Sequence, residues 1–215
     1  MSRLALLAGA TGLVGRELSE QLAASDEYGA VHVLVRRPQP ALVSKAKITV
    51  HVVDFDALPS FPATDDVYIA LGTTIKAAGS EAAFRRVDHD YVLAVARAAR
   101  AAGAQRLGVV SALGADVKSA VFYNRVKGEM QLAIAGLGFE SVVIAQPSLL
   151  LGDREALEQP MRTGEKWARR LLEPLSGLIP VKVRPVPASA VAAALLRNVL
   201  TAPPGISFLE NRALQ

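Results

Sequence analysis

Three closely spaced glycines directly follow the first apolar run of the chain. Residues 3–8 (RLALLA) have the length and composition of a buried strand, and the next seven residues, GATGLVG, place Gly9, Gly12 and Gly15 before an amphipathic stretch over 13–24. Residues without a Cβ atom let the backbone turn tightly, approach a pyrophosphate and bring the helix close to the strand. A tight turn without a ligand is the alternative, but the strand–turn–helix context favours a dinucleotide-binding unit.

Further apolar runs of strand length recur along the chain. They cover 31–35, 48–53, 67–71, 106–110 and 141–146, and 206–210 is a candidate seventh strand. Helical periodicity lies over 13–24, about 82–102, from Phe122 to Leu137 and over about 188–200, whereas the prolines at 38 and 40 predict a loop or single turn. This alternation predicts an α/β fold, a Rossmann-type doubly wound parallel sheet of six to seven strands.

The length of 215 residues predicts one domain over 1–215 with a substantial core. After residue 152 the strand pattern stops, and Trp167, Leu171 and Leu175 mark the apolar face of an amphipathic helix. We therefore expect a small C-terminal helical substrate or lid region over about 152–187, within the single domain.

Composition excludes several classes of site and partner. The chain has no cysteine, and its three histidines, at 32, 51 and 89, lack metal-ligand spacing, so we expect no metal site. The net charge of +4 comes from scattered basic pairs, which argues against nucleic-acid binding. No apolar run is long enough to span a membrane. Charged residues 16 and 17 directly follow the stretch LALLAGATGLVG, which favours a buried strand and a glycine turn over a signal peptide. We therefore expect a cytoplasmic location.

The turn itself supplies the first predicted cofactor contacts, because a helix N-terminus offers free N–H groups and partial positive charge to phosphates. These contacts are Gly9, Thr11, Gly12, Leu13, Val14 and Gly15. Arg36 and Arg37 follow the second strand, where arginine suits a ribose 2′-phosphate and an acidic residue would suit the free 2′-hydroxyl. We therefore expect NADP(H) to be preferred over NAD(H), unless these arginines are ordinary solvated loop residues.

Two more strand ends carry candidate contacts, since ligands of such sheets bind at the carboxyl ends of the strands. After the third strand come Asp54 and Phe55, and Asp54 could accept a hydrogen bond from an adenine amino group. After the fourth come Leu71, Gly72 and Thr73, where the glycine lets the chain pass close to the cofactor. For Asp54 and Thr73, capping of a turn or helix is the competing interpretation.

The candidate catalytic residues follow the fifth strand. Ser111 stands at its carboxyl end, and Tyr123 and Lys127 come twelve and sixteen residues later, four apart and so on one helix face. A lysine ammonium close to a phenol favours the phenolate, which makes Tyr123 a candidate general acid for a carbonyl oxygen or base for an alcohol. Ser111 could hold the same oxygen by a hydrogen bond. A solvated helix face is the alternative for the Tyr/Lys pair.

Together these segments resemble the short-chain dehydrogenase/reductase superfamily. The matching pieces are GATGLVG at 9–15, VRR at 35–37, VDF at 53–55, LGTT at 71–74, VVSALGA around Ser111, YNRVKGE at 123–129 and QPSLLLGDR at 146–154. LGTT and VKGE are similar to the atypical NAD(P)-binding branch, which includes the Tat-interacting protein TIP30 and bacterial epimerase-like proteins.

The resemblance implies a bound NADP(H), the catalytic set Ser111, Tyr123 and Lys127, and a lysine that also binds the nicotinamide ribose. It further implies that Pro147, Ser148 and Leu149 line the nicotinamide. Two positions depart from the pattern. Asp88 stands where many relatives have an asparagine that supports a proton relay, and Gln146 stands where many have arginine.

Two functions fit these residues. The first is an NADPH-dependent oxidoreductase that transfers hydride to a small carbonyl substrate, or from an alcohol, with Tyr123 as general acid. The second is an NADPH-binding regulatory or sensor protein without turnover. The retained Ser/Tyr/Lys set favours the enzyme, while the short substrate region and the missing asparagine favour the sensor. The sequence is compatible with a monomer or a homodimer.

Overall fold

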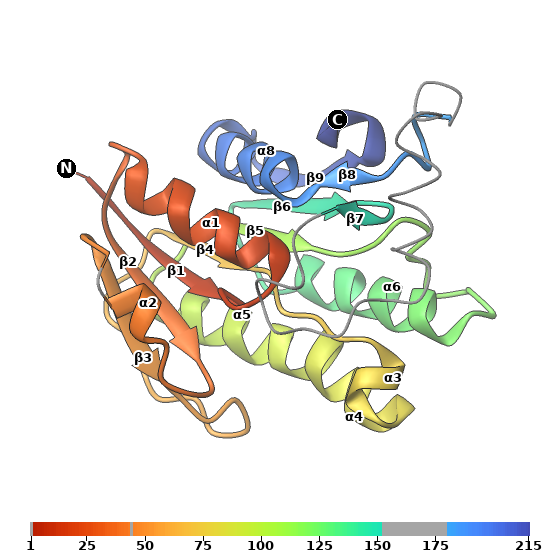
Figure 1. Cartoon of the computed structure of the whole chain (residues 1–215), viewed down its shortest axis with the longest axis horizontal. Helices are drawn as coiled ribbons and strands as arrows, with labels where there is room; N and C mark the ends of the chain where they lie inside the picture. The colour runs from red at the N-terminus through yellow and green to blue at the C-terminus, as the bar shows by residue number, and fades with distance from the viewer. Residues whose placement is uncertain (1, 44, 152–179) are drawn as a thin grey trace.

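A seven-stranded parallel sheet forms the centre of this computed structural model, which describes residues 2–43, 45–151 and 180–215 (Figure 1). Every neighbouring pair of strands in the sheet is parallel, and the order is β3-β2-β1-β4-β5-β6-β9. The strands are β1 (Arg3–Ala8), β2 (Tyr28–Val35), β3 (Ile48–Val52), β4 (Asp66–Ile69), β5 (Arg106–Val110), β6 (Ser141–Gln146) and β9 (Gly205–Glu210). The predicted Rossmann-type sheet is confirmed, with seven strands.

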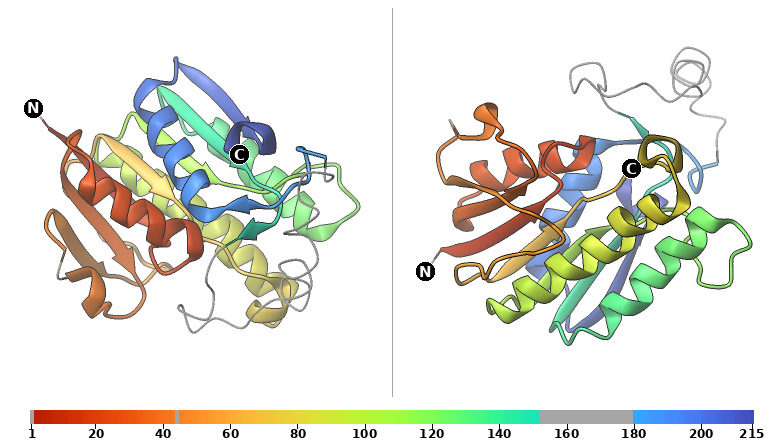
Figure 2. Two further views of the ribbon diagram at one scale, coloured as in Figure 1. Left: turned by 45° about the horizontal axis from the view of Figure 1, so that its top comes forward. Right: turned by 90° about the horizontal axis from the view of Figure 1, so that it is seen from below.

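Helices cover both faces of the sheet (Figure 2). Helices α1 (Leu13–Ala24), α2 (Pro40–Val43) and α8 (Ala188–Thr201) pack on one face, and α5 (Tyr91–Ala101) and α6 (Phe122–Ala135) pack on the other. Alternate residues of the strands therefore enter two separate apolar clusters, which explains why the strand sequences are apolar at consecutive positions. The winding changes direction between β1 and β4, and a crevice for ligands lies at such a switch point.

The predicted helix over 82–102 is interrupted, which corrects the sequence interpretation. Helix α4 (Glu81–Arg85) is joined to α5 by a π-helical turn over Arg86–Asp90, and the one-turn helix α3 (Ile75–Ala78) precedes them. Thr74 and Ser80 cap α3 and α4 through their side-chain oxygens. A π turn rotates the side chains that follow, and here it buries Asp88. Apolar periodicity cannot reveal such a turn, because the apolar positions continue on both sides of it.

The C-terminal part agrees with the prediction in α8 and β9 and adds two short strands and a final turn. Strands β7 (Leu150–Leu151) and β8 (Val186–Pro187) form a short parallel pair outside the main sheet, and a 3₁₀ turn over Asn211–Leu214 follows β9. Most of the predicted substrate region over about 152–187, including the helix around Trp167, lies outside the described residues. In the part of the chain that the structure describes, no helix is long and apolar enough to cross a membrane.

A buried polar cluster ties the amino ends of three adjacent strands. Asp66, fully buried at the start of β4, accepts hydrogen bonds from the Arg3 guanidinium, at 2.7 Å to Nη2, and from the Tyr28 hydroxyl, at 2.7 Å. The Tyr28 and Tyr68 hydroxyls lie 2.7 Å apart. A carboxylate buried in this way is tolerable because a bidentate arginine and a phenol satisfy it.

This cluster predicts a loss of stability at alkaline pH. Burial, together with the neighbouring charges of the cluster, raises the pKa of Tyr28 and of Tyr68 well above 10. The folded protein thus keeps two phenol protons that the unfolded chain releases above about pH 10, so stability is full below that pH and falls as pH rises. Each tyrosine contributes a slope of about 1.4 kcal/mol per pH unit.

Chemical denaturation of wild type and Tyr28→Phe between pH 9 and 11.5 measures this effect. We expect the variant to lose stability less steeply by about 1.4 kcal/mol per pH unit above pH 10, and both proteins to show a flat profile just below it. Equal slopes would show that Tyr28 ionises freely in the folded protein.

Candidate functional site

The turn between β1 and α1 uses its three glycines in different ways. Gly9 has a φ of +94°, and a Cβ atom there would lie 2.5 Å from the Ala70 carbonyl carbon. At Gly15 a Cβ atom would lie 2.0 Å from the Gly9 oxygen, so these two glycines are required by the packing of the chain. At Gly12 the nearest atom would be 3.5 Å away, which is an ordinary contact. The chain itself therefore leaves room at Gly12, which is the space that close approach of a ligand would need.

The remaining turn residues stand at the start of α1. Gly12 is the N-cap and provides no side-chain cap to the first turn, which has no acidic residue. Thr11 is exposed, Leu13 is half-buried, and Val14 is buried in the core. The backbone N–H groups of such a first turn have no helical partner, which suits them to an anion such as a pyrophosphate.

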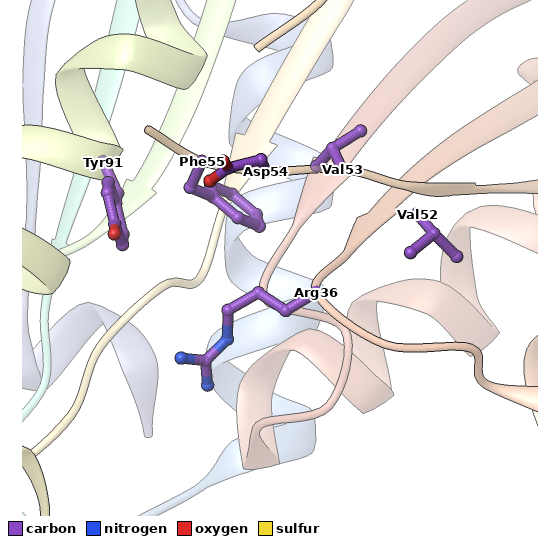
Figure 3. A pocket seen from close by; sticks show the side chains of 6 residues that line it. All are labelled: Arg36, Val52, Val53, Asp54, Phe55 and Tyr91. Atoms are coloured by element: carbon purple, nitrogen blue, oxygen red, sulfur yellow. The ribbon is translucent and has the colours of Figure 1, made fainter. Parts of the chain in front are cut away.

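A pocket of about 430 Å³ lies beyond the ends of β2 and β3 (Figure 3). Its lining residues are Arg36, Val52, Val53, Asp54, Phe55 and Tyr91. Phe55 and Tyr91 place their rings 5.5 Å apart between centroids, and the Arg36 guanidinium extends across from them. Aromatic faces beside an arginine match an adenine ring and a ribose phosphate.

The three polar residues predicted for this region do not all line the pocket. Arg36 lines the pocket, but Arg37 is not among the lining residues and is exposed. Asp54 lines it as well, and its Oδ1 accepts the Asp56 N–H at 2.9 Å, so it also stabilises its own turn. The turn-capping interpretation of Asp54 is therefore confirmed, and its contact with adenine stays a prediction.

The loop after β4 lies at the carboxyl end of the central strand of the sheet. The Thr73 N–H donates to Asp88 Oδ2 at 2.8 Å, while the neighbouring Thr74, and not Thr73, caps α3. At Gly72 a Cβ atom would lie 3.3 Å from Asp88 Oδ1 and 4.0 Å from Lys127 Nζ. The half-buried Leu71 packs against the core. The predicted Leu71–Gly72–Thr73 segment thus lies beside the candidate catalytic lysine.

Lys127 and Asp88 form a buried ion pair. The Nζ–Oδ1 distance is 2.8 Å, and the side chains are only 4% and 1% exposed. Burial alone would lower the pKa of Lys127, but the charge of Asp88, with smaller contributions from Tyr123 and the hydrogen bond, raises it above its usual value. Asp88 is therefore not a simple substitute for a neutral relay residue, because it supplies the counter-charge of the lysine.

One face of α6 carries the predicted residues and one that was missed. Tyr123 packs its ring against the buried Phe84 ring, with 5.3 Å between centroids. At the next interval of four after Lys127 stands Gln131, whose Nε2 donates to Ser111 Oγ at 2.6 Å. A serine hydroxyl that accepts from an amide keeps its own proton for another acceptor. Gln146 Nε2 in turn donates to Gln131 Oε1 at 3.4 Å.

The segment Pro147–Leu149 lies next to the Ser111 loop, and its predicted contact with the nicotinamide stays a prediction. The Leu113 N–H donates to the Pro147 carbonyl at 2.9 Å. Ser148 is bonded to Asn211, in the last turn of the chain. The structure therefore brings the Ser111 loop and the segment after β6 together at the carboxyl edge.

Sequence reasoning missed four residues at or near this edge: Phe84, Tyr91, Gln131 and Asn211. Gln131 could have been found by extending the spacing of four from Tyr123 through Lys127. The other three carried no local signal, since their contacts come from distant segments. No cluster of metal-ligating side chains occurs among the residues that the structure describes.

The buried ion pair predicts a large effect for removal of one partner. We expect Asp88→Ala to lower the free energy of unfolding by about 3–5 kcal/mol, because an unpaired ammonium then stays buried. The double variant Asp88→Ala/Lys127→Met should recover much of that loss. Glu129→Ala, which breaks the more exposed pair with Arg85, is the matched control and should cost under about 1 kcal/mol. Denaturant unfolding measures all three, and a small effect of Asp88→Ala would contradict a buried charge pair.

Comparison with known proteins shows the family. Residues 9–136 match a family model described as NAD(P)H-binding. The protein HTATIP2 of Rattus norvegicus is 33% identical over 216 residues, which covers 96% of this chain and 85% of that protein. The mitochondrial protein FMP52 of Eremothecium gossypii is 38% identical over 152 residues, which covers 70% of this chain and 68% of that one.

These names overturn the expectation of a cytoplasmic location. Several fungal relatives that are 35–39% identical to the chain are named mitochondrial proteins. The expectation was wrong because a Rossmann domain folds alike in either compartment, so its composition and apolar runs contain no information about location.

Among solved structures, an oxidoreductase of the short-chain dehydrogenase/reductase family from Burkholderia thailandensis superimposes with a TM-score of 0.70 at 18% identity, covering 100% of this chain and 93% of that one. At this identity the likeness concerns the fold alone. The family match and the relative that spans nearly the whole chain confirm the predicted resemblance: the chain belongs to the NAD(P)H-binding family, and it is similar to the atypical branch of the short-chain dehydrogenase/reductase superfamily.

Proposed function

We propose that the protein is an NADPH-dependent oxidoreductase that reduces a small carbonyl compound, with Tyr123 as general acid. The observation that carries this proposal is the row of side chains on one face of α6. Tyr123, Lys127 and Gln131 follow at intervals of four, and the last two are bonded to Asp88 and Ser111. Lys127 and Gln131 are buried and are satisfied by these partners, and a helix face that served only as packing would have no need of them.

The chemistry assigns one role to each group. When NADPH is bound, its nicotinamide would supply the hydride that the carbonyl carbon receives. Tyr123 gives its hydroxyl proton to the carbonyl oxygen, so that the C=O bond becomes a CH–OH group, and it recovers a proton from solvent. Ser111 donates its hydroxyl proton in a hydrogen bond to the same oxygen, since its acceptor side is occupied by Gln131. Lys127, held by Asp88, has further N–H groups to direct at the nicotinamide ribose.

The adenosine half of the cofactor fits the pocket beyond β2 and β3. Phe55 and Tyr91 would contact the adenine ring, and Arg36 would pair with the ribose 2′-phosphate. Gly12 and the first turn of α1 would receive the pyrophosphate. This arrangement supports NADPH over NADH, because no acidic side chain follows β2, and Arg36 extends into the pocket.

The ion pair between Asp88 and Lys127 favours a second candidate function. A neutralised lysine assists proton transfer from Tyr123 less than a free ammonium would. A protein that bound NADPH without turnover, and reported the cofactor state to another protein, would retain the ion pair and the pocket for binding alone.

Cofactor titration tests the nucleotide site. By calorimetry we expect wild type to bind NADPH more tightly than NADH. Arg36→Ala/Arg37→Ala should lower the NADPH affinity at least about tenfold, to the NADH level, because a charge-assisted contact is lost. The affinity for NADH should stay within about twofold. Arg97→Ala, on the exposed side of α5, is the matched control. If wild type bound neither cofactor, both candidate functions would be refuted.

A carbonyl screen separates the two candidates. NADPH oxidation would be followed by absorbance for wild type and Tyr123→Phe against small aldehydes and ketones. For the enzyme we expect the variant to lose about a hundredfold or more in kcat, the usual contribution of a general acid, with unchanged NADPH affinity. Tight NADPH binding with no turnover of any compound would favour the regulatory function instead.

A further inference from the structure

A buried asparagine after β9 joins three separate segments at the carboxyl edge of the sheet. Asn211 is only 1% exposed. Its Oδ1 accepts the Ser148 N–H at 2.8 Å, and its Nδ2 donates to the carbonyl oxygens of Val181 and Arg184, both at 2.8 Å. The amide thus links the segment after β6, the segment before β8 and the last turn of the chain.

Ser148 is held by this arrangement from two sides. Its backbone N–H is bonded to Asn211, and its hydroxyl donates to the Arg184 carbonyl at 2.7 Å. Gln215 Nε2 also donates to that carbonyl, at 3.2 Å. The position of Ser148 is therefore set by contacts with residues more than thirty positions away in sequence.

The chemistry of an asparagine side chain is specific to this task. It offers one acceptor oxygen and two N–H hydrogens in one plane. Here the oxygen and both hydrogens have partners. Aspartate would keep the acceptor for Ser148 but would face two carbonyl oxygens with a negative charge. Leucine would have a similar shape and would leave a buried N–H and two carbonyls without this partner, which is costly in a buried site.

The segment that Asn211 holds lies alongside the candidate catalytic serine. Pro147 accepts the Leu113 N–H at 2.9 Å, and Leu113 stands two residues after Ser111. In the sheet, β6 is separated from β2, which precedes Arg36, by β1, β4 and β5. Asn211 therefore acts on one half of the edge and leaves the pocket around Arg36 and Phe55 untouched.

From this arrangement we infer that Asn211 is a positioning residue for the nicotinamide half of the cofactor site. It holds residues 147–149 as a wall beside Ser111, so that the nicotinamide ring is oriented toward Tyr123. This inference rests on the proposed function, because it requires that NADPH lie along this edge with its adenosine half in the pocket beyond β2 and β3.

The test uses two probes that differ in the half that they occupy. NADPH fills both halves, and adenosine 2′,5′-bisphosphate fills only the adenosine half. Calorimetry would compare wild type, Asn211→Asp and Asn211→Leu with each probe. We expect both variants to bind NADPH about tenfold more weakly, as the loss of a buried hydrogen-bonding group implies. Both should bind the bisphosphate within about twofold of wild type. Ser148→Ala, which loses a single bond, should weaken NADPH about threefold.

Asn198→Leu is the matched control, because the Asn198 amide donates to the Ala194 carbonyl within its own helix. It should leave both probes unchanged. If Asn211→Leu does not fold, Asn211→Asp and Ser148→Ala decide the question.

Three outcomes would overturn the inference. Unchanged NADPH binding in the variants would show that Asn211 only fastens the end of the chain. Equal weakening of both probes would show a general loss of structure. If wild type bound neither probe, the proposed function would fail first, and this inference with it.

Discussion

The buried contact between Lys127 and Asp88 is the constraint on which the candidate site depends. A buried ammonium needs a counter-charge, and a buried carboxylate needs donors. Asp88 meets both requirements, since one oxygen binds Lys127 and the other accepts the Thr73 N–H. The pair thereby joins α6, the π-helical turn and the loop after β4. If it were broken, these three segments would lose the charged contact that joins them, and a buried charge would stay without its partner.

Buried charged and polar groups are satisfied differently at the two ends of the sheet. At the amino end, Arg3, Asp66, Tyr28 and Tyr68 satisfy one another almost completely, so that cluster has little left to offer a ligand. At the carboxyl end, each pairing leaves donors in reserve. Lys127 uses one N–H on Asp88, and Ser111 accepts from Gln131 while keeping its own proton. The donors that stay available at the carboxyl end are the groups that the proposed cofactor and substrate contacts require.

Most of the fold could be predicted from sequence, because each element carries its own signal. The strands are continuous apolar runs, and α1 has both an apolar stripe and three glycines before it. Residues whose role depends on a strand end, such as Ser111 and Arg36, could be found in the same way, since the sheet brings all carboxyl ends to one edge. The location could not be predicted at all, because no feature of the folded core depends on it.

What the sequence could not reveal were contacts between distant segments. The π-helical turn leaves the apolar pattern intact while it buries Asp88, and one of the three partners of Asn211 stands 63 residues earlier in the chain. Both residues are polar, buried and far in sequence from the groups that they hold. Buried polar residues of this kind are expensive unless satisfied. In both places the polar residue is tolerated because a distant segment supplies its partners, so each ties two parts of the carboxyl edge together.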